Sequence, residues 1–122
     1  KTVEIWGTGR PKREIMHVDD LASAIYYNTK LKIENKKKIN KQLKNNPVMN
    51  IGSGMEFKIS DFAQLIKKII KCNSKLVFNN KFPDGTPRKI LDNSKIKNLG
   101  WKPKISINKG LKDTIKWYIK NL

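Results

Sequence analysis

The sequence predicts a mixed α/β domain of short strands and helices. Short β-branched segments predict strands, whereas apolar residues that recur every three or four positions predict helices. Turns rich in glycine and proline separate these segments, and neither a repeat nor an internal linker divides the chain. Its 122 residues are the length of one domain with a modest core.

The first third of the chain predicts two strands and a helix. Residues 2–5 are β-prone and run into a loop rich in glycine and proline, and residues 14–18 predict a second short strand. Asp19 or Asp20 is expected to cap the helix that follows. The apolar face of that helix is expected to comprise Leu21, Ala24, Ile25 and either Tyr27 or Asn28.

The middle of the chain predicts a loop, a strand and the strongest helix. From Lys30 to Asn46, polar residues dominate, which predicts a solvated loop with helical character at its start and no specific role for its charges. Residues 48–51 predict a buried strand closed by Gly52-Ser53-Gly54. Ser60 is expected to cap the helix that follows. Its apolar stripe is expected to comprise Phe62, Leu65, Ile66, Ile69 and Ile70.

The last third predicts a strand, a further extended segment and two helices. Residues 75–79 predict the strand, and residues 89–91 are expected to be extended. Asp92 is expected to cap a short helix that ends near Gly100, and Ser106 the terminal helix. The apolar stripe of the terminal helix is expected to comprise Leu111, Ile115, Tyr118, Ile119 and Leu122.

The formal net charge of +17 does not by itself predict nucleic-acid binding. The excess is almost all lysine, is spread along the chain and accompanies many asparagines and isoleucines, as in a coding sequence biased toward A and T. Such a charge can attract a polyanion. However, aromatic residues do not alternate with the cations in any familiar nucleic-acid motif. Specific nucleic-acid binding is therefore not expected.

Cysteine content and hydropathy predict a cytoplasmic protein. A single cysteine, Cys72, excludes an internal disulfide and fits a reducing compartment. It is expected to be a packing residue or a partly exposed thiol, because no histidine lies near it in the sequence. No segment approaches the roughly 20 apolar residues of a membrane span, so no membrane partner is expected.

Arginine is scarce, which makes each arginine informative. Only three of the 27 cations are arginine: Arg10, Arg13 and Arg88. Where lysine supplies charge elsewhere, arginine indicates a need for a planar, bidentate donor for phosphate or carboxylate. Two loops rich in glycine and proline, residues 6–14 and 83–89, carry these arginines. They predict either a clamp on a flat phosphorylated ligand or two surface turns with solvated charges.

Catalytic chemistry is not evident in the chain. His17 is the single histidine, and one histidine without a cysteine cluster is poor metal spacing; it is expected to form a local hydrogen bond where a strand meets a helix. Gly7-Thr8-Gly9 and Gly52-Ser53-Gly54 lack the strand–GxGxxG–helix context of a dinucleotide site. The chain therefore predicts part of a site, with no catalytic residue, no cofactor-binding residue and no metal ligand.

Four segments together resemble one family. They are Trp6–Leu21, with the pattern W-G-T-G-x-P-x-R-E-x-x-H-V-D-D-L, then Asn50–Gly54, Pro83–Ser94 and Leu99–Pro103. In this order they resemble the GDP-L-fucose synthase family of extended short-chain dehydrogenases/reductases. The second half of the first segment and the Leu-Gly-Trp-x-Pro segment occur across the extended enzymes. The combination of Trp6 with Pro-Asp-Gly-Thr-Pro-Arg-Lys is narrower and indicates the GDP-sugar enzymes.

The resemblance implies that residues 1–122 form the C-terminal, nucleotide-sugar-binding portion of such an enzyme. The glycine-rich NADP loop and the catalytic Tyr-x-x-x-Lys pair would belong to a missing N-terminal Rossmann part, so this chain alone is expected to be inactive. The whole enzyme would epimerise GDP-4-keto-6-deoxy-D-mannose and reduce it with NADPH. The resemblance also implies a GDP-sugar as the ligand and a homodimer at full length.

Five residues are assigned to substrate binding by the resemblance. Trp6 would lie near the nucleotide-sugar, Arg13 would contact the diphosphate, and Asp84 and Lys89 would lie on the substrate side of the loop, supported by Arg88. These roles agree with the residue types, since guanidinium groups bind diphosphate in a bidentate manner and an aromatic ring covers a planar or sugar face.

The sequence departs from the family at Phe82, where lysine usually precedes the proline, and in the long basic insert from Lys30 to Asn46. Two alternatives stay open. One is another extended enzyme, such as a nucleotide-sugar dehydratase or 4-epimerase. The other is a non-catalytic basic module that binds phosphorylated ligands or nucleic acid.

Overall fold

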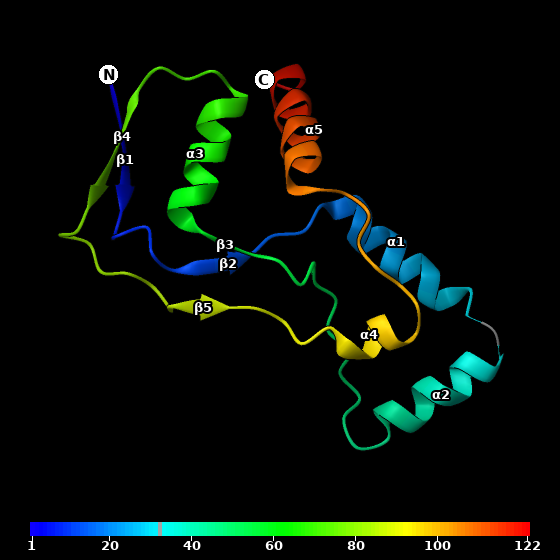
Figure 1. The fold of residues 1–122 in the computed structure, drawn as a ribbon. Helices are drawn as coiled ribbons and strands as arrows, with labels where there is room; N and C mark the ends of the chain where they lie inside the picture. Colours follow the sequence, from blue (N-terminus) through cyan, green and yellow to red (C-terminus); the bar gives the residue numbers. More distant parts are fainter. Residues whose placement is uncertain (32) are drawn as a thin grey trace.

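The computed structural model describes residues 1–31 and 33–122 and confirms a mixed α/β fold. Short strands and helices alternate along the chain (Figure 1). The strands are β1 (Thr2–Trp6), β2 (Lys12–Glu14), β3 (Glu56–Lys58), β4 (Lys75–Asn79) and β5 (Arg88–Lys89). The helices are α1 (Val18–Thr29), α2 (Ile33–Leu43), α3 (Ile59–Ile69), α4 (Ser94–Asn98) and α5 (Ile107–Lys120).

Two small sheets form the frame of the molecule. Strands β1 and β4 pair in parallel, with Trp6 opposite Asn79 at their carboxyl ends. In the second sheet β2 lies in the middle, antiparallel to β3 and parallel to β5. Because β1 leads into β2 and β4 leads into β5, the connections between the two sheets both start from the carboxyl ends of the first pair (Figure 1).

Helices α3 and α5 lie side by side next to the β1–β4 pair (Figure 1). The predicted stripe of α3 is half-buried except at Ile70, which is 49% exposed. On α5, Leu111 and Ile115 of the predicted stripe are half-buried, whereas the residues of the last turns are exposed. The exposed members of the predicted α5 stripe are Tyr118, Ile119 and Leu122.

The buried core lies between α1 and α4, away from the β1–β4 pair. Ala24, Ile96 and Trp101 are its buried members. The Trp101 indole N–H donates to Ser23 Oγ at 3.0 Å, and the Tyr27 hydroxyl donates to the Leu99 carbonyl at 2.7 Å. These bonds satisfy the polar atoms of the two large aromatic residues, so the core fixes α1 against the segment that connects α4 to α5.

The start of α1 differs from the prediction. The second strand ends at Glu14 and begins at Lys12, and α1 begins at Val18, so the strand expected over residues 14–18 is wrong. His17 caps the helix, because its Nδ1 accepts from the Asp19 N–H at 3.2 Å. The local hydrogen bond expected for His17 is therefore confirmed, and the cap expected from Asp19 or Asp20 is wrong.

Asp20 binds a distant part of the backbone and does not cap α1. Its side chain is only 3% exposed, and its two carboxylate oxygens accept from the backbone N–H groups of Lys104 and Ile105 at 2.9 and 3.0 Å. A buried carboxylate needs such donors to offset its desolvation. Asp20 therefore ties the segment before α5 to the first turn of α1.

The middle of the chain also differs from the prediction. Most of the expected loop over residues 30–46 is helix α2, with Lys32 outside the described residues. Residues 48–51 form no strand, although Met49 and Ile51 pack against the core. Strand β3 was not predicted at all. Three residues are too few to show the alternation of polar and apolar side chains that predicts a strand. Glu56–Lys58 are a strand because they pair with β2.

Of the other three predicted helix caps, one is confirmed and two are not found at the N-cap position. Ser106 caps α5, since its hydroxyl accepts from the Lys109 N–H, as predicted. Helix α3 begins two residues earlier than a Ser60 cap would place it, with Lys58 at the N-cap position, so the expected Ser60 cap is wrong. Asp92 accepts from the Ser94 N–H at 3.0 Å, but it lies one residue before the N-cap, Asn93.

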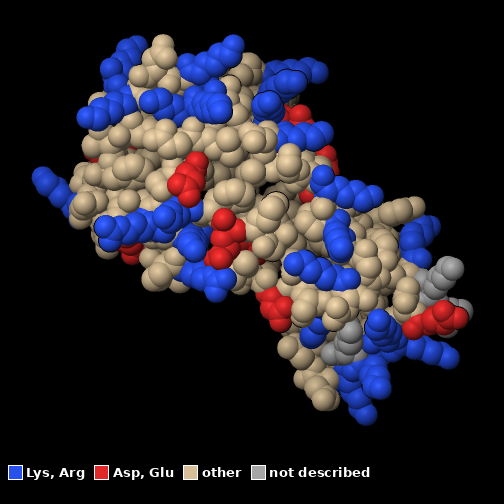
Figure 2. Space-filling view, viewed as in Figure 1, with Lys and Arg blue, Asp and Glu red and all other residues tan. Residues whose placement is uncertain are grey.

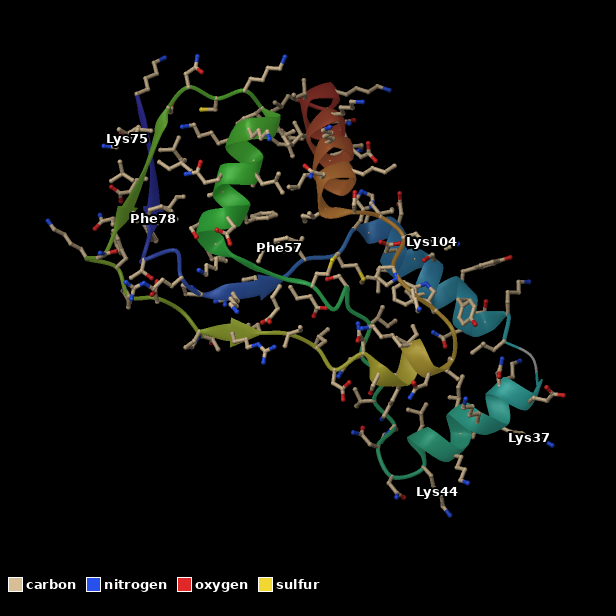
Figure 3. The ribbon with its side chains drawn as sticks, in the orientation of Figure 1. Lys37, Lys44, Phe57, Lys75, Phe78 and Lys104 are labelled. Atoms are coloured by element: carbon tan, nitrogen blue, oxygen red, sulfur yellow. The ribbon has the colours of Figure 1, made fainter. Side chains whose placement is uncertain are left out.

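Cationic side chains are spread around the visible face, with uncharged surface and a few acidic groups between them (Figure 2). Lys37 on α2 and Lys44 just after this helix lie at one end of the molecule, and Lys75 lies at the other (Figure 3). The lysines therefore form no single patch on this view. Within residues 1–31 and 33–122, none of the helices combines the length and the hydropathy that crossing a membrane requires.

Replacing Asp20 tests its structural role. Asp20→Ala should lower the free energy of unfolding by about 1–3 kcal/mol, because two backbone N–H groups would lose their buried acceptor. Urea denaturation measures this difference. The neighbouring Asp19 side chain is 75% exposed, so Asp19→Asn is the matched control and should change stability by less than about 0.5 kcal/mol. Equal effects of the two substitutions would contradict the assignment.

Candidate substrate-binding site

The two loops with the predicted site residues meet at the carboxyl ends of β1 and β4. Trp6 is the last residue of β1, and the second loop begins just after Asn79, the last residue of β4. The Gly7 N–H extends the strand pairing by donating to the Asn79 carbonyl at 3.0 Å. In parallel α/β sheets, ligands bind beyond the carboxyl ends of the strands. The position of the loops fits this rule.

Asp84 joins the two loops directly. Its Oδ1 accepts from the Thr8 backbone N–H at 2.8 Å, and its Oδ2 accepts from the Thr8 hydroxyl at 2.5 Å. These bonds hold the pKa of Asp84 below its ordinary value, with the hydroxyl as the larger cause. Gly7 has φ +82°, and a Cβ at this position would collide with the Asp84 carboxylate. The close approach of the loops therefore requires glycine here.

Trp6 and Phe82 form a stack across the same pair of loops. Their ring centroids are 4.3 Å apart and their planes are inclined by 16°. The indole remains 68% exposed and the phenyl ring 38% exposed. One face of the indole is thus covered by Phe82, and the rest of this ring is open to a ligand.

The second sheet separates the predicted cations between its two faces. In the parallel register of β2 and β5, Arg13 is opposite Lys89, and Lys12 is opposite Arg88. Paired residues share a face and successive residues alternate between faces. Arg13 and Lys89 therefore lie on one face, while Arg88 lies on the other.

The Arg13 guanidinium reaches into the loop that follows β4. Its Nη1 donates to the carbonyls of Thr86 and Lys12, both at 2.7 Å. Its other terminal nitrogen, Nη2, lies beside Gly85, where a built Cβ would be 3.3 Å away. The guanidinium thus holds the loop and also presents its second edge next to a residue without a side chain.

Arg88 is paired with Glu56 on β3. The guanidinium Nε donates to Oε1 at 2.6 Å and Nη2 donates to Oε2 at 2.9 Å. This two-point hydrogen bonding is the first cause that lowers the pKa of Glu56 and raises that of Arg88. The pair joins the two outer strands of the sheet across β2. A direct contact of Arg88 with substrate stays a prediction.

Glu14 was missed in the sequence, although it connects three segments. Its Oε1 accepts from the Gly54 N–H at 2.5 Å and its Oε2 accepts from the Leu91 N–H at 2.9 Å. It also lines an open cavity of about 540 Å³ with Arg88, Lys89, Ile90 and Leu91. A glutamate beside an arginine on a short strand gives no sequence signal for such distant backbone partners.

The structure therefore joins the two loops at three points: Trp6 stacks on Phe82, Thr8 donates to Asp84, and Arg13 donates to the Thr86 carbonyl. Lys89 shares a face of the second sheet with Arg13. Asp84 uses both oxygens to hold Thr8, so its local role is to fix the loops. His17 caps a helix, apart from these loops. Among residues 1–31 and 33–122, no group of three or more histidine, cysteine, aspartate or glutamate side chains could hold a metal ion. The substrate contacts of the five predicted residues stay predictions.

The first part of the sequence matches a known enzyme family. Residues 1–52 match the NAD dependent epimerase/dehydratase family. A probable GDP-L-fucose synthase of rice (Oryza sativa subsp. japonica) is 42% identical over 120 residues, and the GDP-L-fucose synthase of Escherichia coli K12 is 38% identical over 123 residues. Both alignments cover 98% of this chain. The chain is a relative of the GDP-L-fucose synthases.

Solved structures agree with this relationship. A GDP-6-OMe-4-keto-L-xylo-heptose reductase from Campylobacter jejuni superposes with a TM-score of 0.85 at 41% identity, over 100% of this chain and 35% of the reductase. A GDP-mannoheptose C4 reductase from the same organism, with NADP bound, has a TM-score of 0.79 at 38% identity, over 98% and 35% of the two chains. The chain therefore has the fold of about a third of each of these reductases.

The chain spans about a third of the length of the curated GDP-L-fucose synthases that it matches, 33% of the rice protein and 36% of the E. coli protein. The activity, the substrate and the partners of a whole enzyme therefore do not follow directly from the relationship. They have to be argued from the residues that the chain contains.

The Glu56–Arg88 pair predicts a pH dependence of stability. Because folding lowers the pKa of Glu56 below its ordinary value of 4.5, the pair stabilises the fold above that pH, and its contribution is lost as the pH falls through the lowered pKa. Glu56→Gln should therefore destabilise the protein at about pH 7 and have much less effect near pH 3. Denaturation of both proteins across this range measures the difference. A difference that does not depend on pH would contradict the pairing.

Proposed function

We propose that residues 1–122 are the C-terminal, nucleotide-sugar-binding portion of an NADP-dependent GDP-sugar epimerase/reductase of the GDP-L-fucose synthase type. The observation that carries the proposal is the joining of the two loops by the Thr8–Asp84 bonds, with Trp6 at the start of the first loop and Arg13 bound to Thr86 of the second. The high identity to GDP-L-fucose synthases supports the assignment of the nucleotide.

The chemistry of the site suits a nucleoside diphosphate-sugar. Arg13 and Lys89 supply positive charge from adjacent strands, which is what a diphosphate needs. A guanidinium can bind two phosphate oxygens at once, whereas an ammonium acts as a point charge. The open face of Trp6 supplies a surface for a planar or sugar ring. The chain thus holds the substrate, and the reduction is assigned to NADPH bound by another part of the protein.

An uncovered apolar surface supports the assignment to a larger enzyme. On α1, Val18, Leu21 and Ile25 are spaced as one helical stripe, yet they are 68%, 39% and 55% exposed. Of the predicted apolar face of α1, Ala24 is buried, whereas Leu21 and Ile25 are exposed in the chain by itself. Trp117 of α5 is 65% exposed and lines a cavity of about 510 Å³ together with Val18.

Contiguous apolar surface of this kind marks an interface. The relatives are about three times as long as this chain, so the remaining two thirds of such an enzyme would be the natural cover. We assign the α1 stripe to contact with the cofactor-binding portion.

The activity of the full-length protein tests the function. With NADPH and GDP-4-keto-6-deoxy-D-mannose, the full-length protein should form GDP-L-fucose, measured as NADPH oxidation together with chromatography of the nucleotide-sugar. Arg13→Lys should raise KM by an amount equivalent to about 1–3 kcal/mol, because charge is kept but the bidentate geometry is lost.

Arg10→Lys is the matched control for that variant. It makes the same change of side chain three residues away, at a position that is exposed. It should leave KM nearly unchanged. An unaltered KM in Arg13→Lys would remove Arg13 from the site. Turnover of a UDP- or dTDP-sugar in place of the GDP-sugar would instead favour another extended enzyme, such as a dehydratase or a 4-epimerase.

The α1 stripe makes a separate prediction about the full-length protein. Ile25→Lys should lower its free energy of unfolding by about 1–3 kcal/mol, because a charge would enter an apolar interface. Val48→Lys is the control, since Val48 is 59% exposed and lies outside the stripe; it should have little effect. Guanidinium denaturation measures both. Equal stability of the two variants would show that the α1 stripe is not covered.

A further inference from the structure

Phe82 has a structural partner that the sequence did not reveal. The resemblance marks this position as a departure, with phenylalanine in place of lysine before Pro83. In the structure the Phe82 ring covers one face of the Trp6 indole, with centroids 4.3 Å apart and planes inclined by 16°. Residues from two loops, 76 positions apart in the sequence, thus form one aromatic unit.

The backbone that carries the two rings is fixed at one point. The Asn79 carbonyl accepts from the Gly7 N–H at 3.0 Å and from the Phe82 N–H at 3.3 Å. The Asn79 side chain accepts from the Lys81 N–H and donates to the Glu4 carboxylate. The residues that follow Trp6 and carry Phe82 are therefore held by the same asparagine, which limits the motion of the rings relative to each other.

From this geometry we infer that Phe82 is a positioning residue for nucleobase binding. The inference rests on the proposed function. Phe82 occupies one face of the indole, so a planar base can stack only on the opposite, open face of Trp6. An indole without this support would have two open faces and freedom about its side-chain torsions, and part of the binding energy would be lost in ordering it. Base–aromatic stacking is strong enough for this orientation to matter.

The phosphate groups are bound by different residues in the proposed site. Arg13 and Lys89 lie on the β2–β5 sheet, and neither depends on the Trp6–Phe82 stack for its place on a strand. The inference therefore separates the two ends of the ligand. Loss of Phe82 should weaken the binding of a nucleoside diphosphate and spare the binding of pyrophosphate.

The experiment uses the full-length protein that contains this chain. Isothermal titration with GDP and, separately, with inorganic pyrophosphate gives the dissociation constants of the wild type, Phe82→Leu and Phe82→Tyr. Phe82→Leu should raise the Kd for GDP roughly three- to tenfold, the range expected for an aromatic pair, with little change for pyrophosphate. Phe82→Tyr keeps the ring and should restore the wild-type Kd. Steady-state kinetics should show the same effect in KM with little change in kcat.

Tyr118→Leu provides the control, because it also replaces an aromatic ring, in this case one that is 58% exposed on α5. It should bind both ligands as the wild type does. An unchanged Kd for GDP in Phe82→Leu would overturn the inference and leave the proposed function in place. An equal loss of GDP and pyrophosphate would also overturn it, since the loop as a whole would then have changed. A wild type that binds no GDP would overturn the proposed function itself.

Discussion

Carboxylates that accept from distant backbone N–H groups hold this chain together. The chain has 10 acidic residues against 27 cationic ones, and three of those acids join segments that are far apart in the sequence. Asp84 binds Thr8, Glu14 binds Gly54 and Leu91, and Asp20 binds Lys104 and Ile105. Each bond is charge-assisted, which makes it stronger than a neutral one. The candidate site depends on Asp84, which joins its two loops, and on Glu14, which follows Arg13 on β2 and binds the Leu91 N–H two residues after Lys89.

Strand alternation explains why adjacent arginine and lysine residues have different tasks. Arg88 and Lys89 are neighbours, yet β5 sends them to opposite faces of the sheet. Arg88 meets Glu56 there and stabilises the sheet, while Lys89 shares a face with Arg13. The scarcity of arginine therefore identified positions where a guanidinium makes two-point hydrogen bonds. It could not tell whether the partner is a ligand or, as for Arg88, a glutamate of the same chain.

How far the sequence predicts the fold depends on the length of each periodic signal. The stripe of α3 and the segment of β4 were found because their patterns extend over several residues. Strand β3 is three residues long, and only its register with β2 defines it. Helix α2 was predicted only as helical character at the start of a loop, because its many lysines and asparagines leave too few apolar positions for a stripe. The Asp20 and Glu14 bonds could not be predicted, since they join segments whose proximity is a product of the fold.

The stack of Trp6 on Phe82 shows how a change of one residue can redefine a loop. A lysine at this position would add a charge beside the proline, in a chain that already has an excess of positive charge. Phenylalanine adds a ring, and its nearest aromatic partner is the residue that the resemblance assigns to the nucleotide-sugar. Trp6 is covered by Phe82 on one side, and most of its surface remains exposed. In the proposed site, this departure from the family leaves one face of the indole for a ligand. The loop has exchanged a cation for a second aromatic ring, and the Arg13–Lys89 face still supplies the charge that a diphosphate needs.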